Sequence, residues 1–100
     1  MPVVGAGVIG TGQAEYLDVT LEGGRAYSFS VHPSERNVDF DLNIYDQNGN
    51  LVSWDESPAA DAYGVVRPII TGPFRIVVNA VQGMSRIKSR WLVEQRQGRK

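Results

Sequence analysis

Polar and apolar residues alternate without a break over residues 39–45, and this stretch constrains the fold more than any other. In an extended strand successive side chains point to opposite sides, so Phe40, Leu42 and Ile44 share one face. An Asn-Gly pair follows at 48–49 and suits the positive backbone angles of a tight hairpin turn. The stretch predicts a strand with one face in a core and one in water, followed by a hairpin.

The same two-residue period marks other short segments of the chain. The expected strands cover residues 15–21, 26–31, 39–45, 51–54, 64–70, 74–79 and 85–95, with a short edge strand at 3–4 or 8–9. The first two of the seven are expected to form a hairpin, residues 55–63 a loop, and Pro68 marks an edge strand. This spacing predicts an all-β fold: a two-sheet antiparallel β-sandwich, jelly-roll-like, with 7–8 strands.

One hundred residues without cysteine fit a single domain that must be stabilised by its core alone. We expect a glycine-rich lead-in over residues 1–14, the sandwich over 15–95 and a basic tail over 96–100. The predicted core consists of the inward positions of the strands: Leu17, Val19, Leu21, Tyr27, Phe29, Val31, Phe40, Leu42, Ile44, Phe74, Ile76, Val78, Trp91 and Val93.

Charge and hydropathy argue against a membrane protein and against a nucleic-acid reader. No apolar run approaches the roughly 20 residues of a membrane helix, and the apolar start lacks the basic residues of a signal peptide. Arg86, Lys88 and Arg90 form an outward basic stripe on the last expected strand, whereas Trp91 is expected to point into the core. Readers of single-stranded nucleic acid place exposed aromatic rings among their basic residues, so the stripe disfavours this partner.

The acidic residues of the central strand form the best candidate metal site. Asp39 and Asp41 share the water-facing side, and carboxylates are the ligands that calcium prefers. Three acids of the next loop are expected to complete the site: Asp55, Glu56 and Asp61. The alternative is that the two aspartates pair with the basic stripe. Residues 46–57 do not fit an EF-hand loop, because Ser57 stands where the twelfth-position glutamate is needed.

No residue set in the sequence predicts an enzyme. His32 is the only histidine, and no Gly-x-Ser-x-Gly elbow accompanies it. Residues 5–10 match a dinucleotide fingerprint in letters only, since no strand precedes them and no helix follows. With one histidine and no cysteine, zinc is also disfavoured. We therefore expect a chain without catalytic residues and with no organic cofactor.

Outward aromatic residues suggest where a ligand binds. Tyr45 lies on the polar face of the central strand, and Trp54 and Tyr63 flank the acidic loop. Aromatic side chains are favoured anchors at binding surfaces. The alternative is that Trp54 and Tyr63 cover an open end of the sandwich.

The order of these motifs resembles that of the bacterial pre-peptidase C-terminal domain family. The motifs that carry the resemblance span residues 15–95: Gly23-Gly24, residues 27–31, Asp39 to Asp46, Asn48-Gly49, Asp55, and Thr71 to Val78. The last strand departs from the family, with Trp91-Leu92-Val93 in place of Tyr-x-Leu-x-Val, and no protease domain accompanies the chain.

The resemblance implies a non-catalytic accessory module of the kind appended to secreted bacterial proteases, in an extracellular or periplasmic location. Some members, in collagenases, bind calcium and help to engage the substrate. The expected function is therefore a binding module, with calcium as a candidate ligand and a protein or polymer as the partner. The alternative is a structural or self-assembling β-sandwich subunit, and the sequence leaves the oligomeric state open.

Overall fold

A computed structural model describes residues 3–10, 12–34, 39–56, 61–82 and 88–97, with side chains as far as Ala80. Eight strands make up its regular structure: β1 (Val3–Gly10), β2 (Ala14–Leu21), β3 (Tyr27–Pro33), β4 (Asp39–Tyr45), β5 (Leu51–Asp55), β6 (Ala62–Val66), β7 (Gly72–Gln82) and β8 (Lys88–Gln97). Within these residues no helix is long and apolar enough to cross a membrane.

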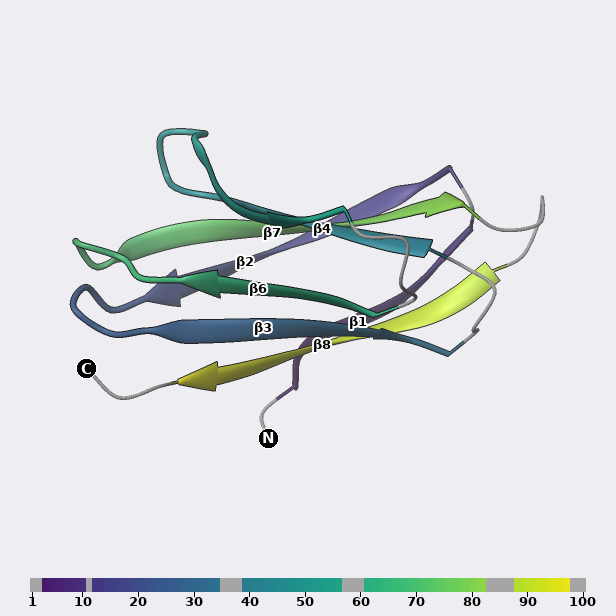
Figure 1. Cartoon of the computed structure of the whole chain (residues 1–100), viewed down its shortest axis with the longest axis horizontal. Helices are drawn as coiled ribbons and strands as arrows, with labels where there is room; N and C mark the ends of the chain where they lie inside the picture. The colour runs from purple at the N-terminus through teal and green to yellow at the C-terminus, as the bar shows by residue number, and fades with distance from the viewer. Residues whose placement is uncertain (1–2, 11, 35–38, 57–60, 83–87, 98–100) are drawn as a thin grey trace.

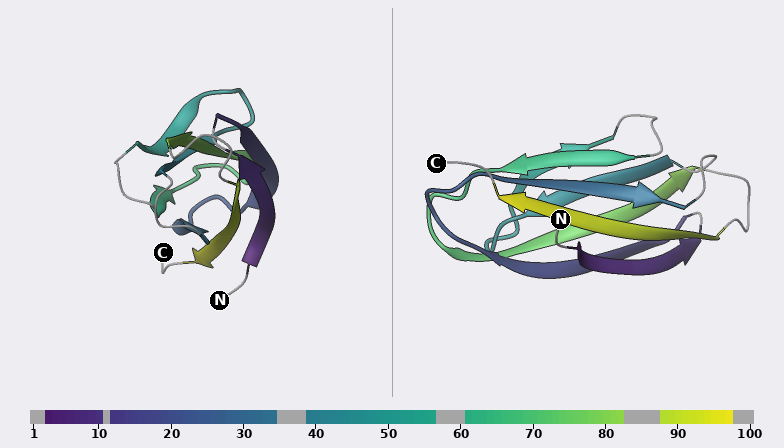
Figure 2. Two further views of the ribbon diagram at one scale, coloured as in Figure 1. Left: turned by 90° about the vertical axis from the view of Figure 1, so that its right-hand side faces the viewer. Right: turned by 90° about the horizontal axis from the view of Figure 1, so that it is seen from below.

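The strands form two antiparallel four-stranded sheets that face each other (Figures 1 and 2). Sheet A has the order β1-β8-β3-β6, and sheet B has the order β2-β7-β4-β5. Every strand pairs with the one at the mirror position in the chain: β1 with β8, β2 with β7, β3 with β6 and β4 with β5. This is the strand order of a jelly roll, so the predicted fold class is confirmed.

The core lies between the sheets and consists of the inward residues of the alternating strands. Phe40, Leu42 and Ile44 of the central strand are fully buried. Ten of the predicted core residues are buried, while Leu17 and Val19 are half-buried and pack against the others. Ile9, Ala62, Val66 and Ala80 join the core as well. The predicted core side chains Trp91 and Val93 lie outside the described side chains.

The predicted hairpin of residues 15–21 and 26–31 is wrong. β2 pairs with β7 in sheet B, whereas β3 pairs with β6 and β8 in sheet A. The turn between them therefore crosses from one sheet to the other. It packs tightly against the β6–β7 connection: a Cβ at Gly23 would lie 2.5 Å from the carbonyl oxygen of Ile69, and the Gly24 N–H donates to Pro68 O at 2.9 Å.

Other differences concern strand bounds. The glycine-rich lead-in carries an eight-residue strand, β1, rather than a two-residue one, and it pairs with β8. The strand expected at 64–70 lies at Ala62–Val66, so it ends before Pro68 and begins inside the expected loop. β7 begins two residues before the predicted strand and ends three residues after it. β8 ends two residues beyond its predicted end, and the predicted residues 85–87 lie outside the described part of the chain. The hairpin of β4 and β5 is confirmed, with Gly49 at a φ of +81° in its turn.

Candidate functional site

The outer face of sheet B gathers polar and aromatic side chains into aligned rows. The strand register places Tyr16, Val77, Asn43 and Trp54 side by side across β2, β7, β4 and β5. Two residues further along the strands, Asp18, Arg75 and Tyr45 form a second row. All of them alternate with buried residues, so they face away from the core. We call these seven residues the sheet B face.

Aromatic rings stand at both ends of the first row of the sheet B face. Tyr16 is 59% exposed and Trp54 is 58% exposed, while Tyr45 is half-buried. Two strands separate Tyr16 from Trp54, so three interstrand steps of about 4.8 Å put their backbones about 14 Å apart. The predicted ligand residues Tyr45 and Trp54 thus share one face.

Tyr63 lies on a different surface from the other two predicted ligand residues. It belongs to β6 in sheet A, between Ala62 and Gly64, which both face the core. Its side chain therefore projects from the outer side of sheet A, where it is 55% exposed. Tyr63 is consequently a natural control for the residues of the sheet B face.

Asp18 and Arg75 form a fixed pair in the second row. The Arg75 Nε donates to Asp18 Oδ1 at 2.9 Å, and Nη2 donates to Oδ2 at 3.2 Å. The guanidinium also lies 4.0 Å from the centroid of the Tyr16 ring, a cation–π contact. The hydrogen bond from Arg75 lowers the pKa of Asp18, so the carboxylate stays ionised at neutral pH. The contacts place the guanidinium between Asp18 and Tyr16, although a pair with side chains 50% and 53% exposed adds little to stability.

A surface depression of about 550 Å³ opens at the turn end of the sheet B face. Asp18, Tyr45, Pro73 and Arg75 line it on the sheet, and Gln47 lines it on the adjoining turn. The turn on one side is held by Asp46, whose Oδ1 accepts the N–H groups of Asn48 and Asn50 at 2.9 Å each. These hydrogen bonds lower the pKa of Asp46, and the bond from the Asn50 N–H has the largest effect. The depression is therefore bounded by an ordered hairpin, and its lining is mainly apolar with the charged groups of Asp18, Asp46 and Arg75 on it.

The predicted metal ligands Asp39 and Asp41 lie on the outer side of sheet B, at the end opposite the depression. Each is half-buried, and Oδ1 of each is shielded from solvent without a hydrogen-bond partner. Burial raises the pKa of both carboxyls. The charge of Asp55 adds to the effect on Asp39, and the charges of Asp39, Glu56 and Asp55 add to that on Asp41. Two unsatisfied carboxylate oxygens are what a cation would neutralise.

The remaining acids of the predicted metal site do not converge on this pair. Asp55 is paired in register with the buried Leu42, and its Oδ2 accepts the backbone N–H of Tyr63 at 2.9 Å, which links the two sheets. Asp61 Oδ2 lies 3.1 Å from Nδ1 of His32, and Glu56 is exposed. Among the residues described, no three acidic or histidine side chains are arranged to hold a metal ion.

The alternative partner for the two aspartates, the basic stripe, is excluded as a cross-strand neighbour. β4 is flanked by β7 and β5, whereas β8, which carries Lys88 and Arg90, lies in sheet A between β1 and β3. Arg86 falls outside the described residues. Alternation predicts which side of a strand faces water but not which strand lies beside it.

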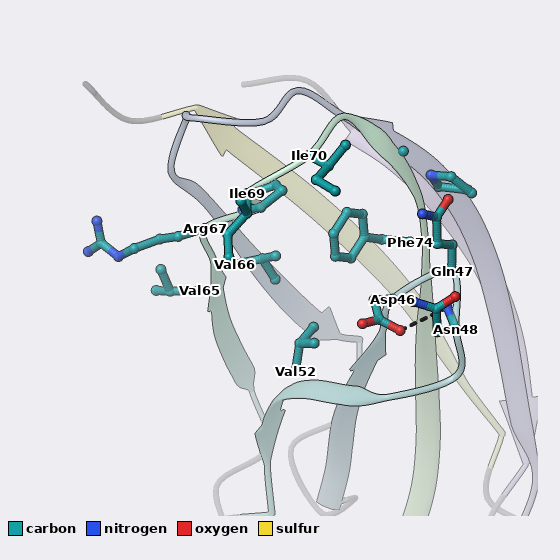
Figure 3. Close-up of a pocket in the computed structure, with 13 residues that line it drawn as sticks. Asp46, Gln47, Asn48, Val52, Val65, Val66, Arg67, Ile69, Ile70 and Phe74 are labelled. Atoms are coloured by element: carbon teal, nitrogen blue, oxygen red, sulfur yellow. Dashed lines mark hydrogen bonds between the residues drawn. The ribbon is translucent and has the colours of Figure 1, made fainter.

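A second hollow of about 320 Å³ lies between the sheets at the turn end (Figure 3). Val52, Val66, Ile70 and Phe74 direct apolar side chains toward it, and Ile69 and Ile70 are largely exposed. Asp46 and Gln47 separate it from the depression on the outer side. The sequence prediction missed this apolar end because Arg67 to Thr71 was assigned partly to a strand.

Sequence reasoning predicted Tyr45 as a ligand residue but missed the Asp18–Arg75 pair beside it in the second row. Tyr16 alternates outward in the sequence, but Asp18 and Arg75 are 57 residues apart and become neighbours only when β2 pairs with β7. Comparison with protein-family models gives no match, and neither does comparison with curated protein sequences. The geometry of the sheet B face therefore carries the functional argument.

Proposed function

We propose that this chain is a non-catalytic binding module that attaches to a protein or polymer ligand through the sheet B face. The observation that carries the proposal is the row with exposed Tyr16 at one end and Trp54 at the other, beside the fixed Asp18–Arg75 pair. Large exposed aromatic rings can bury apolar area against a partner, and they are typical anchors of binding surfaces.

The environment of His32 supports a role without catalysis. Its ring contacts Asp61, and the two side chains are 40% and 47% exposed. A contact this open to water contributes little, so it gives no support to a catalytic role. The resemblance to accessory modules of secreted proteases agrees with this role and suggests an exported protein.

Calcium is part of the proposal as a stabilising ligand near the sheet B face. Asp39 and Asp41 supply two shielded carboxylate oxygens without partners. Calcium completes its shell with backbone carbonyl groups and water, so it does not need every ligand to be a side chain. Burial, and to a smaller extent repulsion from neighbouring carboxylates, raises the pKa of both carboxyls, and a bound ion would offset both effects.

Sedimentation with insoluble polymers tests the binding function. The chain is mixed with cellulose, chitin or fibrillar collagen, and the protein left in solution is measured. We expect at least one polymer to remove the wild-type chain. Trp54→Ala should weaken this binding by about fivefold or more, whereas Tyr63→Ala, with an equally exposed ring on sheet A, should bind as the wild type does. Equal losses in both variants would contradict the proposal, and so would a chain that no polymer removes.

Self-assembly is the second candidate function, and β1 is the observation that favours it. The sheets have four edge strands, β1 and β6 in sheet A and β2 and β5 in sheet B. β5 and β6 are five residues long, and β2 carries Glu15 and Asp18. β1 has eight residues, no charge, and an exposed Val8. Short length and charge protect an edge from pairing with another chain, and β1 has neither protection.

Molar mass in solution tests this second function. Pairing of two β1 edges predicts that the mass rises toward twice 11.0 kDa as the concentration increases. Val8→Lys should return the mass to that of a monomer, whereas Thr20→Lys, on the already charged edge strand β2, should not. A monomer at every concentration in the wild type would contradict self-assembly.

A further inference from the structure

The geometry points to a neutral saccharide chain as the ligand of the sheet B face, an inference that rests on the proposed binding function and names its ligand class. Sugar rings have an apolar face of C–H groups and a rim of hydroxyl groups. A matching surface needs flat aromatic rings with hydrogen-bonding groups of both kinds between them. The sheet B face has both features.

The aromatic residues supply the stacking surfaces. Tyr16 and Trp54 are more than half exposed, and about 14 Å separates their backbones across the sheet. The Arg75 guanidinium covers one face of the Tyr16 ring, so a sugar would stack on the other face. This span is longer than one pyranose ring, so the two rings suit an oligosaccharide that crosses the strands rather than a single sugar. Tyr45, one row away on β4, borders the depression and adds a third ring with a hydroxyl group.

Polar groups occupy the space between the rings. Asn43 lies in the row between Tyr16 and Trp54 and offers both a donor and an acceptor. Asp18 and Arg75 lie in the next row, where two hydrogen bonds join the carboxylate to the guanidinium. A hydroxyl group can donate to the carboxylate and accept from the guanidinium at the same time.

Charge selects among saccharides. The Asp18–Arg75 pair is balanced and holds the only charges among the seven residues of the sheet B face, so this face offers no net positive charge to an anionic chain.

Titration with defined hexasaccharides tests the inference. The probes are cellohexaose and chitohexaose, which are neutral, and hexagalacturonate, which is anionic. Binding is followed by calorimetry and by amide chemical shifts. We expect at least one neutral probe to bind saturably, with shifts centred on residues 16–18, 43–45 and 75–77, and hexagalacturonate to bind more weakly than that probe.

Variants locate the contact. Tyr16→Ala and Trp54→Ala should each weaken the neutral hexasaccharide about two- to tenfold, and Tyr63→Ala should leave the affinity unchanged. Unaltered thermal unfolding of each variant excludes a folding defect. Trp54→Phe keeps a ring and should retain more affinity than Trp54→Ala.

Three results would overturn the inference, and they separate it from the proposed function. Stronger binding of hexagalacturonate than of the neutral probes contradicts a neutral ligand. Binding of collagen through Trp54 without binding of any hexasaccharide contradicts a saccharide but leaves the binding module intact. Failure to bind any hexasaccharide or insoluble polymer contradicts both.

Discussion

Replacing Phe40 with alanine should lower the free energy of unfolding by about 3–5 kcal/mol. Phe40 is fully buried on β4, between the two sheets, so the variant loses the burial of a phenyl ring and leaves a cavity. A loss of this size is comparable to the whole stability of many small domains, and Phe40→Leu, at about 1–1.5 kcal/mol, provides a variant that still folds. Urea unfolding of the three proteins measures the difference.

Asn43 is the matched control for Phe40 because it lies on the same strand and faces the other way. Asn43→Ala should change the free energy of unfolding by no more than about 0.5 kcal/mol, since the side chain is half-buried on the outer side of sheet B. Similar losses at the two positions would contradict the assignment of β4 to one buried and one water-facing side.

Calcium at 10 mM should stabilise the chain by about 1.4–2.7 kcal/mol if its dissociation constant is about 0.1–1 mM, the range of extracellular modules. For a domain of this size the melting temperature would rise by about 5–20 °C, and a chelator would reverse the shift. The physical reason is that the ion neutralises Asp39 and Asp41, whose shielded oxygens have no partner in the described structure. Thermal unfolding with and without calcium measures it.

Asp41→Asn separates the calcium effect from a general salt effect. The variant should lose the calcium-dependent shift. In chelator it should be more stable than the wild type by about 0.2–1 kcal/mol, because the neutral amide is shielded from water at lower cost than a carboxylate and is not repelled by Asp39, Glu56 and Asp55. Asp18→Asn, which alters an exposed aspartate on the same sheet, should keep the calcium shift. An equal shift in both variants, or none in the wild type, would remove calcium from the proposal.

Protons should compete with calcium at the same carboxyl groups. The fold raises the pKa of Asp39 and Asp41, so it favours their neutral forms. Without calcium, the stability that these two groups contribute is complete below their ordinary pKa of about 3.9 and is lost as the pH rises through the raised values. The calcium-dependent shift should accordingly disappear as the pH falls through the same range.

The sequence carried enough information for the faces of individual strands but not for their neighbours. Alternation at residues 39–45 predicted the burial of Phe40, Leu42 and Ile44 because the two-residue period directly reflects strand geometry. The pairing of β2 with β7 was not predictable in this way, since every strand shows the same period and the pairing joins residues more than 50 positions apart.

The glycine content of β1 explains why its length was underestimated. Three of its eight residues are glycine, which is depleted in strands, so the local signal indicated a lead-in segment. Its pairing with β8 supplies the hydrogen bonds that the local sequence does not favour. The candidate site was likewise predictable only where its residues lie on a local hairpin. Tyr45 and Trp54 share one face because β4 and β5 form the predicted hairpin. Tyr63 does not join them, because β6 belongs to the other sheet.

Hydroxyl-radical footprinting of the chain bound to its polymer tests the sheet B face most directly, because oxidation rates report the exposure of individual aromatic side chains. Tyr16 and Trp54 on sheet B, and Tyr63 on sheet A, begin with nearly the same exposure. We predict that binding lowers the oxidation rates of Tyr16 and Trp54 and leaves that of Tyr63 unchanged. Protection of Tyr63 with unchanged rates at Tyr16 and Trp54 would contradict the assignment of the ligand to sheet B.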